Sequence, residues 1–432
     1  MKKTLALLLT VLMVLSSIGT IAAAQTAKPV EIQFLHGQPE EERVAAIQKI
    51  IDGFMAANEG ITVTQVPVPE DGYWTKIATL ISSGQMPALV ESGVDMLRLM
   101  NAEEVIDLPA NTAAIAAIGK DRFFAGALEM AKASGSDDYL GVPVSGWVSG
   151  VWYRKSMFEA KGLAAPDTWE NILAAAKALN DPANKMYGIV FPTEESDFTE
   201  QIFTHFVVSN NVELFDADGK PQFNTPQMKE ILSFYKELYQ YCLPGSVGVT
   251  EVKDTFVGGH AAMGMYSTYI MGALNEAGLA DDIGFAVPAN KQVGGFGMTS
   301  TMTITADLDD AQREAAIKFI TYMGTPEANI TWCHMSAGGS NPVLRDVAVN
   351  QSYLDNAVLK AFGETAQKVP EGFEKMQMLG VQNGSAHPAM GIITSRFIIP
   401  RGIYQILVQG KDIDEQMAIT QQELEDEVAA VR

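Results

Sequence analysis

The sequence predicts an α/β protein made of two units, because strand-like and helix-like segments alternate in two successive parts of the chain. The first alternation covers residues 31–94 and the second covers residues 167–287. Residues 25–432 are long for one hydrophobic core and suit two domains. Between the alternations, residues 139–155 (YLGVPVSGWVSGVWYRK) have the composition of a strand that leaves one unit for the other.

Residues 1–24 have the features of a secretory signal peptide. Two lysines give a charged start, residues 5–15 form an apolar run, and three alanines at 22–24 provide a cleavage site. The apolar run is shorter than the roughly 20 residues that cross a bilayer. No cysteine near the cleavage site offers a point for a lipid anchor. We therefore expect a soluble, exported protein.

The net charge argues against certain binding partners, and the two cysteines bear on disulfide bonding. The formal net charge is −22, which would repel nucleic acid and anionic membranes. The two cysteines, Cys242 and Cys333, each lie in a helix-like apolar context. We expect two buried thiols rather than a disulfide.

The first unit reads as a parallel sheet covered on both faces. Strands are expected at residues 31–35, 61–66 and 87–90. One helix is expected to begin at 40–42, and a second, with Trp74, Ile77, Leu80 and Ile81 on its apolar face, to end near 84. Ligands of such sheets bind beyond the carboxyl ends of the strands. This rule directs attention to the loops around His36 and Glu91.

The second unit repeats the pattern, and the last third mixes strands and helices. Asp167 and Glu170 predict a capping box for a helix over 169–179. Further strands are expected at 187–191, 262–265, 283–287 and 298–304, a strand-like crossing at 336–344, and helices at 198–208, 226–241, 311–323, 397–407 and 413–431.

Several motifs resemble one known family. YLGVPVSGWVSGVWYRKSMFEAKGL, followed by APDTWENILAAAKAL, is similar to the crossing strand and following helix of the carbohydrate-type extracellular solute-binding proteins of ABC importers, the maltose-binding-protein family. FVGGHAAMGMYS, GFAVPA, EAAIKFITYM and ILVQGKDIDEQMAITQQEL resemble later family segments in the same order. The resemblance covers essentially all of residues 25–432.

The resemblance implies a two-lobed periplasmic-binding-protein fold of type II with three crossing segments, near 141–146, 283–288 and 340–345. Lobe one would comprise 28–140 plus 289–340, and lobe two 141–288 plus 341–432. The implied location is the periplasm. The implied function is to capture a sugar or oligosaccharide by hinge closure and to deliver it to ABC permease subunits, as a monomer without a cofactor. Tyr266 and Tyr269 stand where a maltodextrin binder has tryptophan, so the identity of the sugar does not transfer.

Sugars are bound by aromatic faces and by planar polar groups that pair with hydroxyls. Trp147 is the first candidate, because neighbouring glycines leave its ring little covered by adjacent side chains; packing between the lobes is the alternative. Trp152 is expected in the core. The full set of candidate ligand-binding residues is His36, Gln38, Trp74, Glu91, Ser92, Ser145, Trp147, Tyr266, Ser267, Tyr269, Gly295, Phe296 and Asn341.

Signatures of an enzyme or a metal site are weak. The chain has no G-x-S-x-G elbow and no H-E-x-x-H helix, and its five histidines are dispersed. We therefore assign no catalytic and no metal-binding residue. Two alternatives stay open: a secreted glycan-active enzyme, and the same binding fold with a polyamine, a phosphodiester or an iron complex as its ligand.

Overall fold

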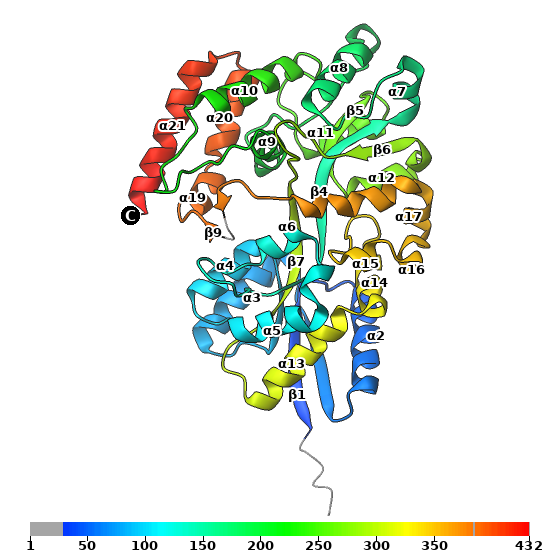
Figure 1. The fold of residues 1–432 in the computed structure, drawn as a ribbon, viewed down its shortest axis with the longest axis vertical. Helices are drawn as coiled ribbons and strands as arrows, with labels where there is room; N and C mark the ends of the chain where they lie inside the picture. The colour runs from blue at the N-terminus through cyan, green and yellow to red at the C-terminus, as the bar shows by residue number, and fades with distance from the viewer. Residues whose placement is uncertain (1–28, 383–384, 432) are drawn as a thin grey trace, which may run out of the picture.

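The computed structural model describes residues 29–382 and 385–431, so the predicted signal peptide lies outside the described residues. The chain forms two lobes joined by strands β4 and β7 (Figure 1). The strands are β1 (Val30–His36), β2 (Ile61–Pro67), β3 (Leu89–Ser92), β4 (Val142–Arg154), β5 (Met263–Ser267), β6 (Ile283–Ala286), β7 (Gly297–Ile304), β8 (Val381–Gln382) and β9 (Ser385–Ala386).

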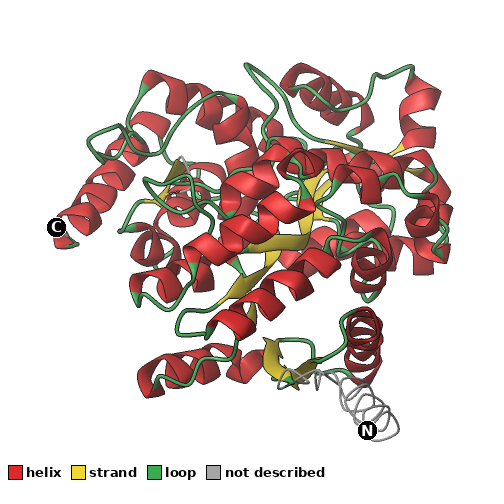
Figure 2. Cartoon of the chain, turned by 60° about the horizontal axis from the view of Figure 1, so that its bottom comes forward, coloured by secondary structure: helices red, strands yellow, loops and turns green. Residues whose placement is uncertain are grey.

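Helices surround these strands in both lobes (Figure 2). Those before β7 are α2 (Glu41–Ala57), α3 (Glu70–Ser83), α4 (Val94–Ala102), α5 (Leu108–Ile118), α6 (Ala125–Met130), α7 (Lys155–Lys161), α8 (Trp169–Leu179), α9 (Asp197–Ser209), α10 (Pro226–Tyr239), α11 (Val249–Val257) and α12 (Ile270–Glu276). Those after it are α13 (Asp310–Met323), α14 (Pro326–His334), α15 (Arg345–Ala348), α16 (Gln351–Leu354), α17 (Ala357–Phe362), α18 (Glu364–Lys368), α19 (Met390–Ser395), α20 (Ile398–Leu407) and α21 (Ile413–Ala430).

The first lobe is built on the strand order β2-β1-β3-β7. β1 is parallel to β2 and β3, as predicted, and β7 joins β3 antiparallel. Neighbouring residues of β1 face opposite sides of the sheet, because side chains alternate along a strand. Phe34 packs in the main hydrophobic core, whereas Leu35 packs in a smaller cluster that includes residues of α3 and α4. Both faces of this sheet are therefore covered.

β4 is the strand that passes from one lobe to the other, as its sequence predicted. Its first part, from Val142 to Val148, pairs antiparallel with β7. From Ser149 onward it pairs with β5, and from Val151 with β6 on its other edge. The change of partners between Val148 and Ser149 marks the point where the strand leaves the first lobe. Trp152 is fully buried, as expected of a core residue.

Glycines let β4 approach its neighbours closely. A Cβ on Gly150 would lie 2.6 Å from the carbonyl oxygen of Ala286 and 2.7 Å from the Phe285 ring. We expect Gly150→Ala to lower the free energy of unfolding by about 1–3 kcal/mol, the usual cost of overpacking. Gly272→Ala in α12 is the control, since a Cβ there meets nothing within 4 Å and should be neutral or stabilising. Equal urea midpoints for both variants would contradict the close-packing account.

A histidine on α9 holds two of the connecting segments together. His205 is fully buried, and its Nδ1 lies 2.8 Å from the carbonyl oxygen of Gly294, on the segment that returns the chain from β6 to β7. Its Nε2 lies 2.6 Å from Ser149 Oγ, at the point where β4 changes partners. Because a carbonyl only accepts, Nδ1 carries the proton and Nε2 accepts from the serine hydroxyl. Burial lowers the pKa of His205 to about 4, so the ring is neutral.

Some local predictions were wrong. The segment 187–191 forms only isolated bridges, to Ala261, Cys242 and Gly264, instead of a continuous strand ladder. The N-cap of α8 is Thr168, whose hydroxyl accepts from Asn171 N, whereas the predicted cap Asp167 accepts from the Asn171 side chain. The segment 336–344 also makes isolated bridges only, including Gly146 with Asn341.

The prediction for the two cysteines is confirmed. Cys242 and Cys333 are buried and form no disulfide. Across residues 29–382 and 385–431, no helix combines the length and the apolar character that a membrane span requires.

Candidate ligand-binding cleft

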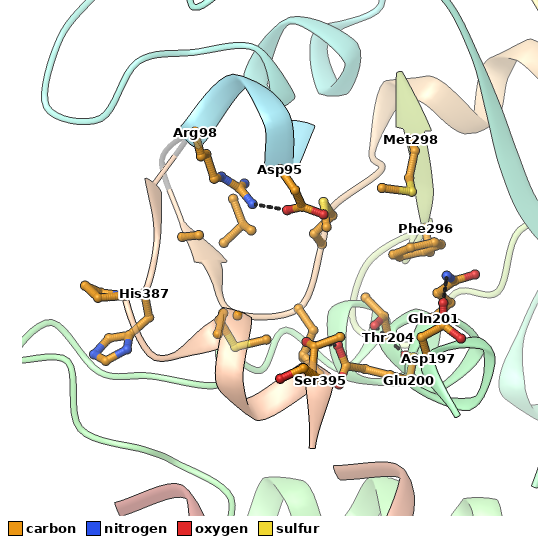
Figure 3. Close-up of a pocket in the computed structure, with 18 of the residues that line it drawn as sticks. Asp95, Arg98, Asp197, Glu200, Gln201, Thr204, Phe296, Met298, His387 and Ser395 are labelled. Atoms are coloured by element: carbon orange, nitrogen blue, oxygen red, sulfur yellow. Dashed lines mark hydrogen bonds and ion pairs between the residues drawn. The ribbon is translucent and has the colours of Figure 1, made fainter. Parts of the chain in front are cut away.

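A cavity of about 860 Å³ is lined from both lobes. Its walls come from α4 and β7 on one side, from α9 and α19 on the other, and from the segment around β8 and β9 (Figure 3). Its volume is within the range usual for small-molecule sites in proteins.

One wall is a polar stripe on α9. Asp197, Glu200, Gln201 and Thr204 line the cavity, and their spacing of three and four residues places them on one face of the helix. The remaining sides of α9 are buried against other elements, with Phe198, Phe203 and Phe206 among the contacts. The apolar faces fix the helix in the core and leave the polar stripe toward the cavity.

Glu200 is the most perturbed group of this stripe. Its Oε1 accepts a hydrogen bond of 2.9 Å from Thr394 Oγ1 on α19. Burial, helped by the nearby charges of Asp197 and Asp95 and opposed by the hydrogen bond from Thr394, raises the pKa of Glu200 to about 7. Near neutral pH its carboxyl group is therefore able both to donate and to accept a hydrogen bond.

The opposite wall carries an ion pair on α4, directly after β3. Arg98 Nη1 lies 3.2 Å from Asp95 Oδ1, one helical turn away. Burial lowers the pKa of Arg98, and the pairing with Asp95 opposes that shift. The guanidinium is thus held in place by a neighbour on its own helix (Figure 3).

Phe296 and Met298 contribute the apolar surface where the chain enters β7. Trp147 on β4 pairs with Met298 in the sheet register, and its ring lies 5.6 Å from the Phe296 ring at 55°. Trp147 is half-buried and packs against a residue that lines the cavity. Aromatic surface beside planar polar groups is the chemistry that sugar recognition uses.

A second, smaller cavity of about 70 Å³ contains four of the predicted residues, Gln38, Glu91, Ser145 and Tyr269. Glu91 is fully buried within β3 rather than after it, and accepts bonds from Gly37 N (3.1 Å), Gln38 Nε2 (3.0 Å) and Ser300 Oγ (2.8 Å). Burial nevertheless raises the pKa of Glu91. Ser300 lies two residues after Met298 on β7, so both cavities lie along one face of that strand.

Several predicted site residues have structural partners. His36 is buried between Gln65 Oε1 (3.1 Å) and the backbone of Gln38 (3.2 Å). Ser145 accepts a bond of 3.0 Å from Trp332 Nε1. Asn341 donates to Gly338 O (3.0 Å) and accepts from Tyr353 Oη (3.1 Å).

The remaining predicted residues lie at varied positions. Trp74 on α3 and Tyr269 after β5 are about half exposed, at 52% and 53%. Tyr266 and Ser267 belong to β5, where the Tyr266 ring packs against Phe198 at 5.3 Å. Ser92 is buried in β3 and Gly295 is buried beside Met376.

The polar residues of α4, α9 and α19 that line the cavity were not among the residues predicted from the sequence. One signal for α9 was available: Asp197, Glu200, Gln201 and Thr204 follow one another at a spacing of three and four residues, which gives a helix one polar face. Asp95 and Arg98 gave a weaker signal, because an acid and a base three residues apart usually form a surface pair. The contribution of α19 depends on tertiary packing alone.

Comparison with known proteins identifies the class. The model of the family described as bacterial extracellular solute-binding protein matches residues 38–330. The chain belongs to this family of bacterial extracellular solute-binding proteins.

Among individual relatives, the YcjN protein of Escherichia coli (strain K12), named as an ABC transporter periplasmic-binding protein, is 38% identical over 397 residues. The match covers 92% of each chain.

Solved structures show the same two-lobed fold of type II. A cyclic alpha-maltosyl-1,6-maltose binding protein from Arthrobacter globiformis superposes with a TM-score of 0.76 at 17% identity, covering 93% of this chain and 99% of that one. The sugar-binding protein MalE from Xanthomonas citri gives 0.76 at 18% identity, covering 93% and 98%. A solute-binding protein of Agrobacterium radiobacter K84 in complex with ribitol gives 0.65 at 21% identity, covering 92% and 98%.

Proposed function

We propose that this solute-binding protein captures a sugar, an oligosaccharide or a related polyol in the cleft lined by α4, α9, α19 and Phe296. The observation that carries the proposal is the composition of that cavity. The ring of Phe296 and the thioethers of the lining would cover the C–H surface of a sugar, and the carboxyl, amide and guanidinium groups of the two walls would pair with its hydroxyls.

The related structures support this ligand class. They were determined for proteins that bind a cyclic maltosyl-maltose, maltose, ribitol, alpha-D-tagatose and D-mannitol, which are all uncharged polyhydroxylated molecules.

The proposed setting is the periplasm, with export directed by the predicted signal peptide. The protein would act as a monomer without a cofactor and without catalysis, and deliver its ligand to ABC permease subunits, as the name of the E. coli relative implies for that protein. Ligand binding would favour a closed arrangement of the lobes that the permease recognises.

The lobe boundaries form part of the same proposal. Lobe one comprises 28–140 plus 289–340, and lobe two 141–288 plus 341–432. The bridge between Gly146 and Asn341 supports two crossings that lie side by side. The change of β4 partners places the first crossing after Val148, several residues beyond the proposed boundary at 141.

Isothermal titration calorimetry tests the ligand class. The panel contains maltose, D-galactose, D-mannitol, ribitol and a cyclic tetrasaccharide, with spermidine, a phosphodiester and a ferric chelate as representatives of the other classes. We expect one-to-one binding of at least one uncharged member and no turnover during long incubation. Tight binding of only a charged compound, or release of cleaved glycan, would overturn the proposal.

A substitution in the cleft tests the role of the aromatic surface. We expect Phe296→Ala to weaken sugar affinity at least about tenfold, because it removes the ring beside the polar wall and the support that this ring gives Trp147. Trp147→Ala should act in the same direction. Tyr404→Ala, on α20 outside the cavity lining, is the control and should keep wild-type affinity. If both cleft variants fold and bind sugar with wild-type affinity, the two rings contribute to packing and not to ligand binding.

A further inference from the structure

His205 is fully buried and is not part of the cleft lining, yet its two hydrogen bonds join segments that carry that lining. Its Nδ1 lies 2.8 Å from Gly294 O, and its Nε2 lies 2.6 Å from Ser149 Oγ. Thr204, the residue before it on α9, lines the cavity, and so does Phe296, two residues after Gly294 (Figure 3). His205 therefore connects the helix of the polar wall to the segment of the aromatic ring.

Ser149 extends this connection to Phe296 itself. The backbone N–H of Ser149 donates to Phe296 O at 2.9 Å, while its hydroxyl meets His205. Ser149 is also the residue at which β4 changes its partner from β7 to β5, so the sheet holds its backbone. The His205 ring thus acts on the backbone of Phe296 by two routes, along the chain from Gly294 and across the hydrogen bond from Ser149.

Further bonds between α9 and the returning segment lie farther along the helix. Ser209 O accepts from Lys291 N at 2.9 Å and from Gln292 N at 3.1 Å. Ser209 is the last residue of α9, about one turn beyond His205. His205 therefore provides the attachment nearer to the part of α9 that lines the cavity.

The residue type suits this position. Gly294 O requires a donor, and the Ser149 hydroxyl donates to the other ring nitrogen, so the side chain between them must both donate and accept. A neutral imidazole does so from the two ends of a rigid ring. Burial favours that form, because it lowers the pKa of His205 to about 4. A carboxylate only accepts and a lysine or arginine only donates, so an amide is the closest substitute.

We propose that His205 is a positioning residue for ligand binding: its bonds to Gly294 and Ser149 hold the Phe296 ring at the distance from the polar stripe of α9 that a sugar ring requires. The inference rests on the proposed function and deepens it, because it assigns a determinant of affinity to a residue that does not contact the ligand. The bonds exist before the ligand binds, so little ordering of the two surfaces is left to oppose binding.

Calorimetry with the tightest-binding uncharged member of the panel tests the proposal. His205→Leu keeps much of the side-chain volume and removes both bonds, and it should weaken binding at least about tenfold. His205→Gln keeps one donor and one acceptor and should recover most of the lost affinity. A residue that only filled space would not be rescued by glutamine in preference to leucine, so equal affinities of the two variants would contradict the proposal.

A double-mutant cycle tests whether the effect passes through Phe296. If His205 acts by placing the Phe296 ring, removal of that ring leaves His205 little to act on. His205→Leu should then weaken binding by less than about threefold in the Phe296→Ala background. Losses that multiply would mean that the two residues act independently, which overturns the proposal.

Asn111→Leu is the control for lost stability. Asn111 on α5 is fully buried and bonded to Asp107 O (2.8 Å), Ile304 O (3.1 Å) and Ile304 N (2.9 Å), and none of these residues lines the cavity. This substitution also removes buried hydrogen bonds, but it should keep wild-type affinity at temperatures well below unfolding. A loss of affinity as large as that of His205→Leu would mean that reduced stability alone weakens binding, and would overturn the proposal.

Ser149→Ala keeps the test decisive if the leucine variant does not fold. It removes one partner of His205 and retains the backbone bond to Phe296 O, and it should weaken binding at least about threefold. Wild-type affinity in Ser149→Ala overturns the proposal whatever the leucine variant does. If the wild-type protein binds no uncharged compound, the proposed function fails. If it binds one and His205→Leu binds equally well, this inference alone fails.

Discussion

His205→Ala should destabilise the ligand-free protein by about 3 kcal/mol, which is a large share of the stability of an ordinary domain. The substitution leaves the carbonyl of Gly294 without its donor and opens a cavity in a fully buried site. An unpaired buried polar group costs about 1–3 kcal/mol, and loss of buried side-chain volume adds to this. Ser149 loses its partner at 2.6 Å and keeps only a long contact of 3.4 Å to Phe296 O.

Urea unfolding measures the effect. His260→Ala is the matched control, because His260 is exposed and its loss should change stability by less than about 0.5 kcal/mol. A similar small change for His205→Ala would mean that the contacts at the point where the chain crosses between lobes contribute little to the fold.

The second large effect concerns the pH dependence of stability. The pKa of Glu200 is raised in the folded state to about 7 from an ordinary value near 4.5, so the folded protein binds a proton that the unfolded chain has lost in this range. This difference makes stability fall as pH rises from about 4.5 to about 7. The pKa of His205 is lowered from about 6.5 to about 4, and this makes stability rise with pH from about 4 to about 6.5.

The two contributions oppose each other between about pH 4.5 and 6.5, and Glu200→Gln removes one of them. We expect the stability of this variant, relative to wild type, to increase by about 3 kcal/mol between pH 4.5 and pH 7.5. The cost of burying an unpaired amide is the same at every pH, so it shifts the curve and leaves its slope unchanged. Urea midpoints across this range give the slope, with Glu195→Gln as the exposed control. A difference that stays constant with pH would contradict the burial of an ionisable Glu200.

The environments of His205 and Glu200 could not be predicted from the sequence, although much of the fold could. Most strands, the long helices and the crossing role of β4 were predictable because hydrophobic period and glycine placement are local signals. The position of His205 between Ser149 and Gly294 was not predictable, because its two partners are 56 and 89 residues away in the chain.

Only part of the candidate cleft could be predicted, because local signals reveal strand ends but not contacts between distant segments. The rule that ligands bind beyond strand ends pointed to Gln38 and Glu91, which do line a cavity with Tyr269. The same rule pointed to His36, which is buried among its own partners. Glu200 appeared only as a member of the predicted helix over 198–208, and Asp197 lay just before it, since nothing local revealed that their face meets α4 and α19 across a cavity.

A crystal structure of the protein with its tightest-binding uncharged sugar tests the central claim most directly. The account predicts a sugar in the cavity between α4 and α9, with a ring against Phe296 and hydroxyls within hydrogen-bonding distance of the polar side chains that line the cavity. A sugar bound elsewhere on the molecule, or one in this cavity that contacts neither Phe296 nor those polar side chains, would contradict it.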